Sequence, residues 1–156
     1  MLTLLLLAAC STSPASLHAA LPGVSSGATE ASPAPSPESV AGLVALTSST
    51  GMTYYVLRSG AGGSPVPGQT VGVHYSGWLE SGVQFDSSVE RGKLFVFPVG
   101  IGRVIKGWDE AVLEMKVGEK RQIRIPPHLG YGDKGAGGVI PAGATLIFDV
   151  ELVELR

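Results

Sequence analysis

The sequence predicts an α+β fold in which an antiparallel β-sheet wraps around one α-helix. Only one stretch, residues 104–118, has the period of an amphipathic helix, and several short segments around it alternate apolar and polar residues as strands do. Glycine (22) and proline (11) are frequent among the 156 residues, which suits short strands joined by turns. A lone helix with one apolar face needs a sheet to cover it.

The predicted helix carries one apolar stripe. Its large or apolar residues recur at i, i+3, i+4 and i+7: Trp108, Ala111, Val112 and Met115. Asp109 lies in the first turn and Lys116 in the last, as the helix macrodipole favours, and Gly118 is placed to end the helix in a left-handed conformation. We expect Trp108 at one end of the helix–sheet core, and periodicity alone favours a packing role for it.

Six segments have the composition or alternation of strands: 52–58, 70–80, 83–86, 94–97, 122–125 and 145–152. In the second of these, Val71, Val73 and Tyr75 share one face, and His74 and Ser76 share the other. Residues 126–143 form a long Gly-rich loop, and such a loop is usually functional or disordered. Its G-x-G-x-x-G match at 130–135 lacks the preceding strand and the following helix that a dinucleotide site requires, so we give a nucleotide ligand almost no weight.

The first ten residues predict that the protein is exported across a membrane. Residues 1–10 have the length of a signal-peptide apolar region and are too short to span a bilayer. Leu7-Ala8-Ala9-Cys10 resembles the lipobox of bacterial lipoproteins, which makes the single cysteine, Cys10, the expected lipidation site. No Lys or Arg precedes the apolar run. An ordinary secretory signal or a chance apolar terminus is the alternative.

Three regions follow from composition. Residues 1–10 are the expected signal peptide with its lipobox-like end, residues 11–50 are a Ser/Ala/Pro-rich segment expected to be a flexible linker, and residues 51–156 are the folded domain. A net charge of -2 without a basic block makes nucleic acid an unexpected partner. A single cysteine excludes an internal disulfide and a Cys-based metal cluster.

Most catalytic constellations are missing from the sequence. His18, His74 and His128 are scattered without a second ligand at helical or turn spacing, so we expect no metal site. No G-x-S-x-G motif occurs, and Ser87 and Ser88 have no evident base beside them. Aromatic residues recur instead along the predicted domain, and one carboxylate directly follows an aromatic residue in Phe85-Asp86.

Several motifs occur together in order: Gly68-Gln69-Thr70, Val73-His74-Tyr75-Ser76-Gly77, Phe85-Asp86-Ser87-Ser88, Val104-Ile105-Lys106-Gly107-Trp108, Tyr131-Gly132, Ile140-Pro141 and the run from Ala144 to Leu152. With their spacing they closely resemble the FKBP-type peptidyl-prolyl cis-trans isomerases over residues 52–156. The resemblance implies a bent antiparallel sheet around one short helix. It also implies an isomerase that needs no cofactor and no metal.

The resemblance assigns residues to a pocket between the helix and the sheet. It implies catalytic roles for Asp86, Tyr131, Tyr75, Phe85 and Trp108, with Trp108 as the pocket floor. It implies substrate-binding roles for Phe95, Phe97, Val104, Ile105, Val139, Ile140 and Phe148. The backbone N–H of Ile105 is expected to bind a substrate carbonyl. The implied ligands are proline-containing polypeptides and macrolides such as tacrolimus or rapamycin.

Three functions remain open at this point. A prolyl isomerase, expected to be monomeric and attached to the membrane only through its lipid anchor, is favoured. It is expected in a bacterial cell envelope, facing the periplasm or the exterior, with a secreted or soluble periplasmic form as the alternative. A binding module that holds a partner in the pocket is the second possibility, although both Asp86 and Tyr131 are present. A structural lipoprotein with an inert β-rich domain is the third.

Overall fold

The computed structural model describes residues 35–156. Cys10, the rest of the expected signal peptide and the first part of the expected linker lie outside the described residues. Among residues 35–156, no helix combines the length and the apolar character needed to cross a membrane.

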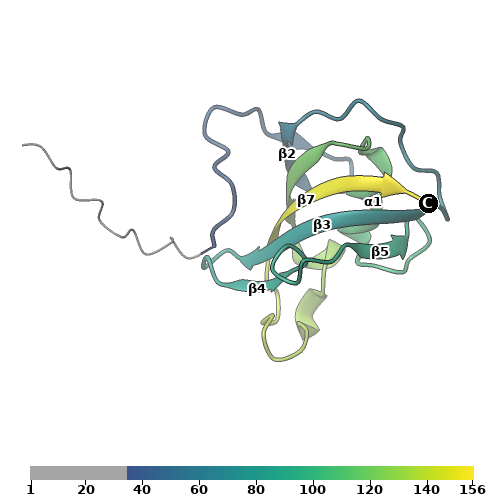
Figure 1. Ribbon diagram of the computed structural model, residues 1–156. Coiled ribbons are helices and arrows are strands. Elements are labelled where there is room, and N and C mark those ends of the chain that lie inside the picture. Colours follow the sequence, from purple (N-terminus) through teal and green to yellow (C-terminus); the bar gives the residue numbers. More distant parts are fainter. Residues whose placement is uncertain (1–34) are drawn as a thin grey trace, which may run out of the picture. The chain divides into compact units, whose positions relative to one another are not determined.

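The described residues build one antiparallel sheet (Figure 1). Its strands are β1 (Leu46–Thr47), β2 (Thr53–Arg58), β3 (Thr70–Leu79), β4 (Gln84–Ser87), β5 (Phe95–Pro98), β6 (Lys120–Ile125) and β7 (Leu146–Leu155). Their order is β1-β2-β6-β7-β3-β4, and β5 also pairs with β3, next to β4 along the same edge. The long strands β3 and β7 pair at the centre.

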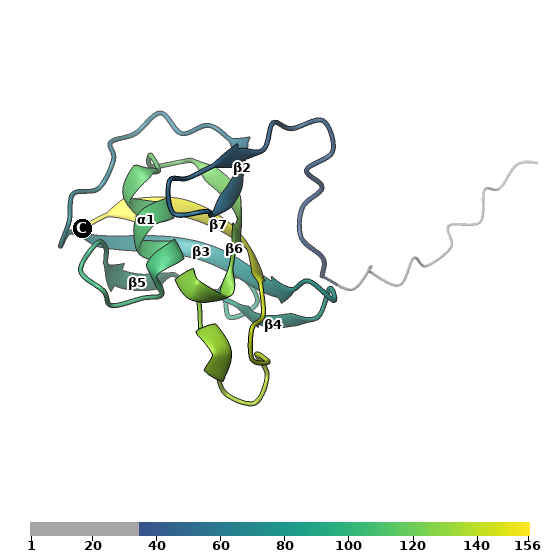
Figure 2. The same ribbon diagram turned by 180° about the vertical axis from the view of Figure 1, so that it is seen from behind.

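The only α-helix of the described chain, α1 (Lys106–Glu114), packs against one face of this sheet (Figure 2). The four residues of the predicted apolar stripe are all buried there: Trp108, Ala111, Val112 and Met115. Gly107 permits a close approach to the sheet, because a Cβ at this position would lie 2.8 Å from Cγ2 of Ile125. The predicted α+β class, a sheet wrapped around one short helix, is confirmed.

The helix is shorter at both ends than the predicted range 104–118, and its C-terminal end explains most of the difference. Met115 adopts an extended conformation (φ -75°, ψ 160°), which ends α1 while keeping the Met115 side chain in the core. Lys116 therefore lies outside the helix. Gly118 does have a positive φ of 87°, but it turns the chain into β6, where its N–H donates to the carbonyl of Leu152 (2.8 Å).

The two faces of β3 differ as the alternation predicted. Val71, Val73 and Tyr75 are buried in the core on the helix side. His74, Ser76 and Trp78 alternate with them and point to the opposite side of the sheet, which we call the outer face. The same alternation on β6 and β7 brings polar residues to the outer face, including Gln122 and Asp149.

Residues 35–50 differ from the prediction of a flexible linker. Leu46 and Thr47 form β1 and pair with β2, and Glu38 hydrogen-bonds to β6 and β7. Figure 1 shows this segment (dark blue) running from beside the ends of β3 and β4 to β2. The ordered domain therefore includes residues that composition alone assigned to a linker.

The loop between β6 and β7 folds back on itself. It contains two short 3₁₀ helices, η1 (Pro127–Leu129) and η2 (Gly132–Lys134), and a bridge in which Ala136 and Ile140 exchange two backbone hydrogen bonds of 3.0 Å. This bridge turns Ile140 inward, so that its side chain is buried in the core. The loop thereby holds Tyr131 beside the start of the helix.

Candidate active site

A cavity of about 290 Å³ opens between the start of α1, the end of β4 and the loop after β6. It is lined mostly by aromatic and aliphatic side chains, with two charged residues and one exposed phenol: Tyr75, Phe85, Asp86, Phe95, Arg103, Val104, Ile105, Trp108, Tyr131 and Phe148. Every residue to which the resemblance gave a catalytic role lies in this lining.

Trp108 lies at the bottom of the cavity and is nearly inaccessible to solvent. It packs against the surrounding rings in T-shaped geometry, with centroid distances of 4.9 Å to Tyr75 and 5.3 Å to Phe148. Phe95 adds a further T-shaped contact at 5.9 Å. Edge-to-face packing of this kind fixes ring orientation as well as burying apolar area. The cavity floor is therefore a rigid aromatic surface.

Gly77 on β3 makes one wall of the cavity possible. A Cβ at this position would lie 2.7 Å from a carbon of the Phe148 ring and 2.8 Å from Cζ of Phe85. No side chain fits there, so the two rings pack edge to face directly over the β3 backbone at 5.5 Å. The φ of Gly77 is not positive, so the backbone conformation does not require glycine. Glycine is needed at this position because the two rings approach the backbone so closely.

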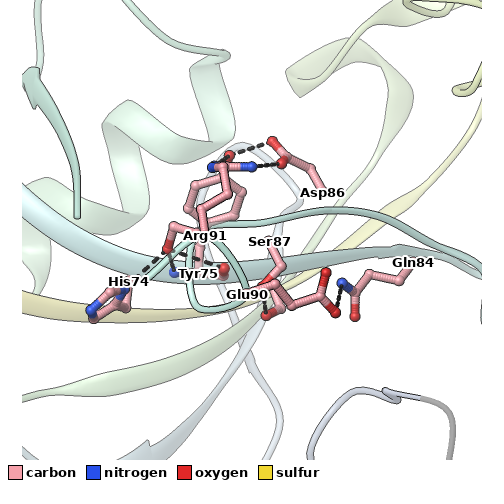
Figure 3. Close-up of polar contacts among 9 residues, drawn as sticks. His74, Tyr75, Gln84, Asp86, Ser87, Glu90 and Arg91 are labelled. Carbon is pink, nitrogen blue, oxygen red and sulfur yellow. Dashed lines mark hydrogen bonds and ion pairs between the residues drawn. The ribbon is translucent and has the colours of Figure 1, made fainter. Parts of the chain in front are cut away.

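A polar network lies at the edge of the cavity (Figure 3). The Tyr75 hydroxyl donates to one oxygen of Asp86, and the guanidinium of Arg91 forms an ion pair with the other. Arg91 also donates to the Tyr75 hydroxyl (3.1 Å) and lies 5.8 Å from the centroid of its ring. The three groups hold one another in place, so that the Asp86 carboxylate has a defined position at the cavity edge.

This network fixes the protonation states of its members. Burial of the Tyr75 phenol, followed by its hydrogen bond to Asp86, raises the pKa of Tyr75 to about 12. Burial also disfavours ionisation of Asp86, but the hydrogen bonds from Tyr75 and Arg91 and the charge of Arg91 outweigh it. The pKa of Asp86 is therefore held below its ordinary value of 3.8. At neutral pH the site contains a carboxylate and a neutral phenol.

The start of α1 presents a free backbone donor to the cavity. Ile105 is the N-cap residue of the helix, and within residues 35–156 its N–H makes no hydrogen bond. The positive end of the helix macrodipole lies at the same place and favours an electronegative atom there. Tyr131 faces this region with 42% of its surface exposed, and its hydroxyl makes no hydrogen bond to any described residue. Both groups are placed to contact a ligand.

Three predicted substrate-binding residues do not line the cavity. Phe97 is buried behind it and stacks on Phe95 at 5.2 Å, so it supports the wall without forming it. Ile140 is turned into the core by the bridge to Ala136. Val139 lies at the exposed tip of the loop, with 55% of its surface accessible. The other four, Phe95, Val104, Ile105 and Phe148, lie in the lining.

Two site residues were missed by sequence reasoning. Arg91 lies five positions after Asp86, in the turn that follows β4, and only the fold of that turn brings the two side chains together. Arg103 lines the cavity and makes no ion pair or hydrogen bond within the described chain. Asp86 and Arg91 carry opposite charges, but a separation of five residues in a turn follows no helical or strand period, and Arg103 likewise lies in a loop without periodicity.

The remaining candidates for other chemistry lie away from the cavity. His74 is on the outer face, where Nδ1 lies 3.2 Å from Oγ of Ser88, and His128 hydrogen-bonds the carbonyl of Thr50 (3.0 Å). Ser88 is fully buried and holds the backbone N–H of Tyr75 (2.8 Å). Within residues 35–156 no group of three His, Cys, Asp or Glu side chains is arranged to hold a metal ion.

Comparison with known proteins identifies relatives for most of this domain. A family model described as FKBP-type peptidyl-prolyl cis-trans isomerase matches residues 62–153. "FK506-binding protein 1" of Dictyostelium discoideum is 50% identical over 106 residues, which cover 68% of this chain and 99% of that protein. "FK506-binding protein 2" of Yarrowia lipolytica is 62% identical over 88 residues, which cover 56% of this chain and 61% of that protein.

Solved structures agree with these sequence matches. The crystal structure of AtFKBP13 superposes with a TM-score of 0.69 at 41% identity, covering 72% of this chain and 99% of that one. The chain spans less than two thirds of the Yarrowia relative's own length.

Proposed function

The chain belongs to the FKBP-type peptidyl-prolyl cis-trans isomerases, a family of enzymes, and from this premise we propose that it accelerates rotation about Xaa-Pro bonds in envelope or secreted polypeptides. The observation that carries the proposal is the cavity itself. Trp108 forms a rigid apolar floor, and a single ionised carboxylate, Asp86, is fixed at the edge. We propose that this cavity takes the proline ring.

The barrier to rotation comes from amide resonance. The planar Xaa-Pro bond must lose its partial double-bond character to twist, which makes uncatalysed exchange take tens to hundreds of seconds. The twisted state has lost conjugation and gains less from water at its carbonyl oxygen. An apolar cavity that grips the ring and excludes water therefore favours the twisted state over the planar one.

Each polar group then has a defined task. The free N–H of Ile105 binds a substrate carbonyl, and the adjacent helix start favours the partial charge on that oxygen. Asp86, held by Tyr75 and Arg91, faces the imide from the cavity edge and orients the bound peptide. Tyr131 orients the peptide at the cavity mouth. No covalent bond to the protein and no proton transfer are needed.

The direct test is the exchange of a short Xaa-Pro peptide between its cis and trans forms, measured by NMR exchange spectroscopy with and without the full chain. We expect exchange to accelerate in proportion to enzyme concentration and to saturate with peptide. If the chain instead binds the peptide with no change in exchange rate, it is a binding module and the proposed catalysis is wrong.

The same cavity is proposed to take macrolides of the FK506 type, which the names of the relatives record for those proteins. It has an apolar floor and a free backbone donor, which suits a pipecolyl-like ring with an adjacent carbonyl. We also propose that the protein acts as a monomer.

The cellular location is also proposed. The sequence Leu7-Ala8-Ala9-Cys10 supports lipidation of Cys10 and attachment to a bacterial envelope membrane, with the domain facing the periplasm or the exterior. We expect the protein to fractionate with membranes in its native host, and Cys10→Ser to move it to the soluble fraction or leave it uncleaved. If the unaltered protein is recovered in the soluble fraction without detergent, simple secretion replaces this proposal.

A further inference from the structure

Arg103 is the one charged residue of the cavity lining that has no counter-ion within residues 35–156. The only carboxylate in the lining, Asp86, is already paired with Arg91 and hydrogen-bonded by the Tyr75 hydroxyl. Arg103 makes no ion pair with any described residue. The cavity and its edge therefore hold two guanidinium groups and one carboxylate, and the unbalanced charge is that of Arg103.

The loop that carries Arg103 is fixed to the helix. The Asp109 carboxylate of α1 accepts hydrogen bonds from the N–H of Gly100 (2.9 Å) and from the N–H of Gly102 (2.7 Å), one on each oxygen. Both glycines have the positive φ that this loop requires, 77° and 76°. Asp109 therefore holds the backbone beside Arg103 and does not neutralise its guanidinium, which stays exposed at the cavity.

A bound peptide brings its side chains within reach of this guanidinium. In the proposed complex the proline ring rests on Trp108. The residues before and after the proline have Cα atoms about 3.8 Å from that of the proline, so they lie at or near the cavity wall. Arg103 is part of that wall. A guanidinium binds a carboxylate through two parallel hydrogen bonds, which an uncharged amide side chain cannot reproduce.

We propose that Arg103 makes the enzyme selective for polypeptides that carry Glu or Asp next to the proline, by pairing with that carboxylate in the bound peptide. The inference rests on the proposed function and names a substrate class for the same cavity. The ion pair lies outside the bond that twists, so the planar and twisted forms gain equally from it. Such uniform binding lowers KM and leaves kcat nearly unchanged.

The test compares peptides that differ in a single charge. One pair has Glu or Gln before the proline, and the second pair has Glu or Gln after it, with both peptide ends blocked. Exchange between cis and trans forms is measured by NMR with the full chain, and the uncatalysed rate of each peptide is subtracted. We expect kcat/KM to favour the Glu peptide about three- to tenfold in at least one pair, as for a partly exposed ion pair. Added salt should reduce this preference.

Substitutions at Arg103 assign the preference to its charge. Arg103→Gln should bring the ratio of kcat/KM for the Glu and Gln peptides close to one, and Arg103→Lys should keep most of the preference. Arg103→Glu should reverse it, because like charges repel. Lys106→Gln is the matched control, since Lys106 is an exposed cation on the first residue of α1 that does not line the cavity. This control should keep the ratio of the unaltered protein.

Three results would overturn the proposal: equal kcat/KM for both members of each peptide pair, a Glu preference that persists in Arg103→Gln, and an equal loss of preference in Lys106→Gln. The last would assign the selectivity to the general positive potential of the surface. A chain that accelerates exchange of no peptide contradicts the proposed function instead. Dissociation constants from chemical-shift titration then still compare the Glu and Gln peptides, and a Glu preference that Arg103→Gln abolishes supports the role of Arg103.

Discussion

Replacing Trp108 with alanine is expected to destabilise the domain by about 3–5 kcal/mol, the usual cost of truncating a buried tryptophan, and to abolish measurable isomerase activity. The side chain is 4% exposed and packs against Tyr75, Phe95 and Phe148 in T-shaped geometry. Its loss leaves a cavity between α1 and the sheet and removes the floor on which the proline ring rests. Chemical denaturation monitored by circular dichroism gives the free energy of unfolding.

Two controls separate stability from function in this experiment. Trp108→Phe keeps an aromatic floor of smaller area, so it should lose less stability and retain part of the activity. Val139→Ala changes an exposed side chain outside the cavity and should alter neither quantity. If Trp108→Ala unfolds no more easily than Val139→Ala, the helix–sheet contact described above does not stabilise the domain.

Asp86→Ala is expected to lower kcat/KM for a proline peptide by about tenfold to a hundredfold, the range set by one charged hydrogen bond of about 1.5–3 kcal/mol. The substitution removes the charge that faces the imide and frees both Tyr75 and Arg91. Stability should change by no more than about 1 kcal/mol, because both side chains of the ion pair are partly exposed to solvent, 39% for Asp86 and 51% for Arg91. Activity and unfolding are measured on the same preparation.

Glu90→Ala is the matched control for this variant. Glu90 lies on the same turn and hydrogen-bonds Gln84 (2.8 Å), but it does not line the cavity. Its activity should equal that of the unaltered protein. A loss of stability of 2–5 kcal/mol in Asp86→Ala, the size of a large core truncation, would mean that Asp86 is structural and that its assigned role is wrong.

The local pattern of apolar and polar residues was sufficient to predict the regular elements of the fold, the helix and the strands. The spacing of Trp108, Ala111, Val112 and Met115 predicted the buried face of α1, and alternation in β3 predicted which of its residues enter the core. Both predictions follow from the periods of the helix and the strand, which depend only on residues a few positions apart. The resemblance to a known family then predicted that most of the aromatic residues lie in one pocket.

The local sequence pattern did not predict structure that depends on contacts between residues far apart in the sequence. β1 has two residues, and the segment before it is held by side chains of Trp78, Gln122 and Asp149, so composition alone assigned it to a linker. The helix α1 ends early because Met115 adopts an extended conformation, which still places its side chain in the core. Ile140 was expected at the cavity rim, but the bridge to Ala136 buries it.

The central claim is that the cavity twists an amide without moving a proton, and the pH–rate profile tests it most directly. The pKa of Asp86 lies below its ordinary 3.8 and that of Tyr75 is about 12, so neither group changes its protonation near neutrality. His74 and His128 lie outside the cavity. We expect kcat/KM for a proline peptide to be nearly constant between about pH 5.5 and 8.5. A bell-shaped profile with a limb near neutrality, abolished by His74→Gln or His128→Gln, would show that an essential acid or base operates and contradict the account.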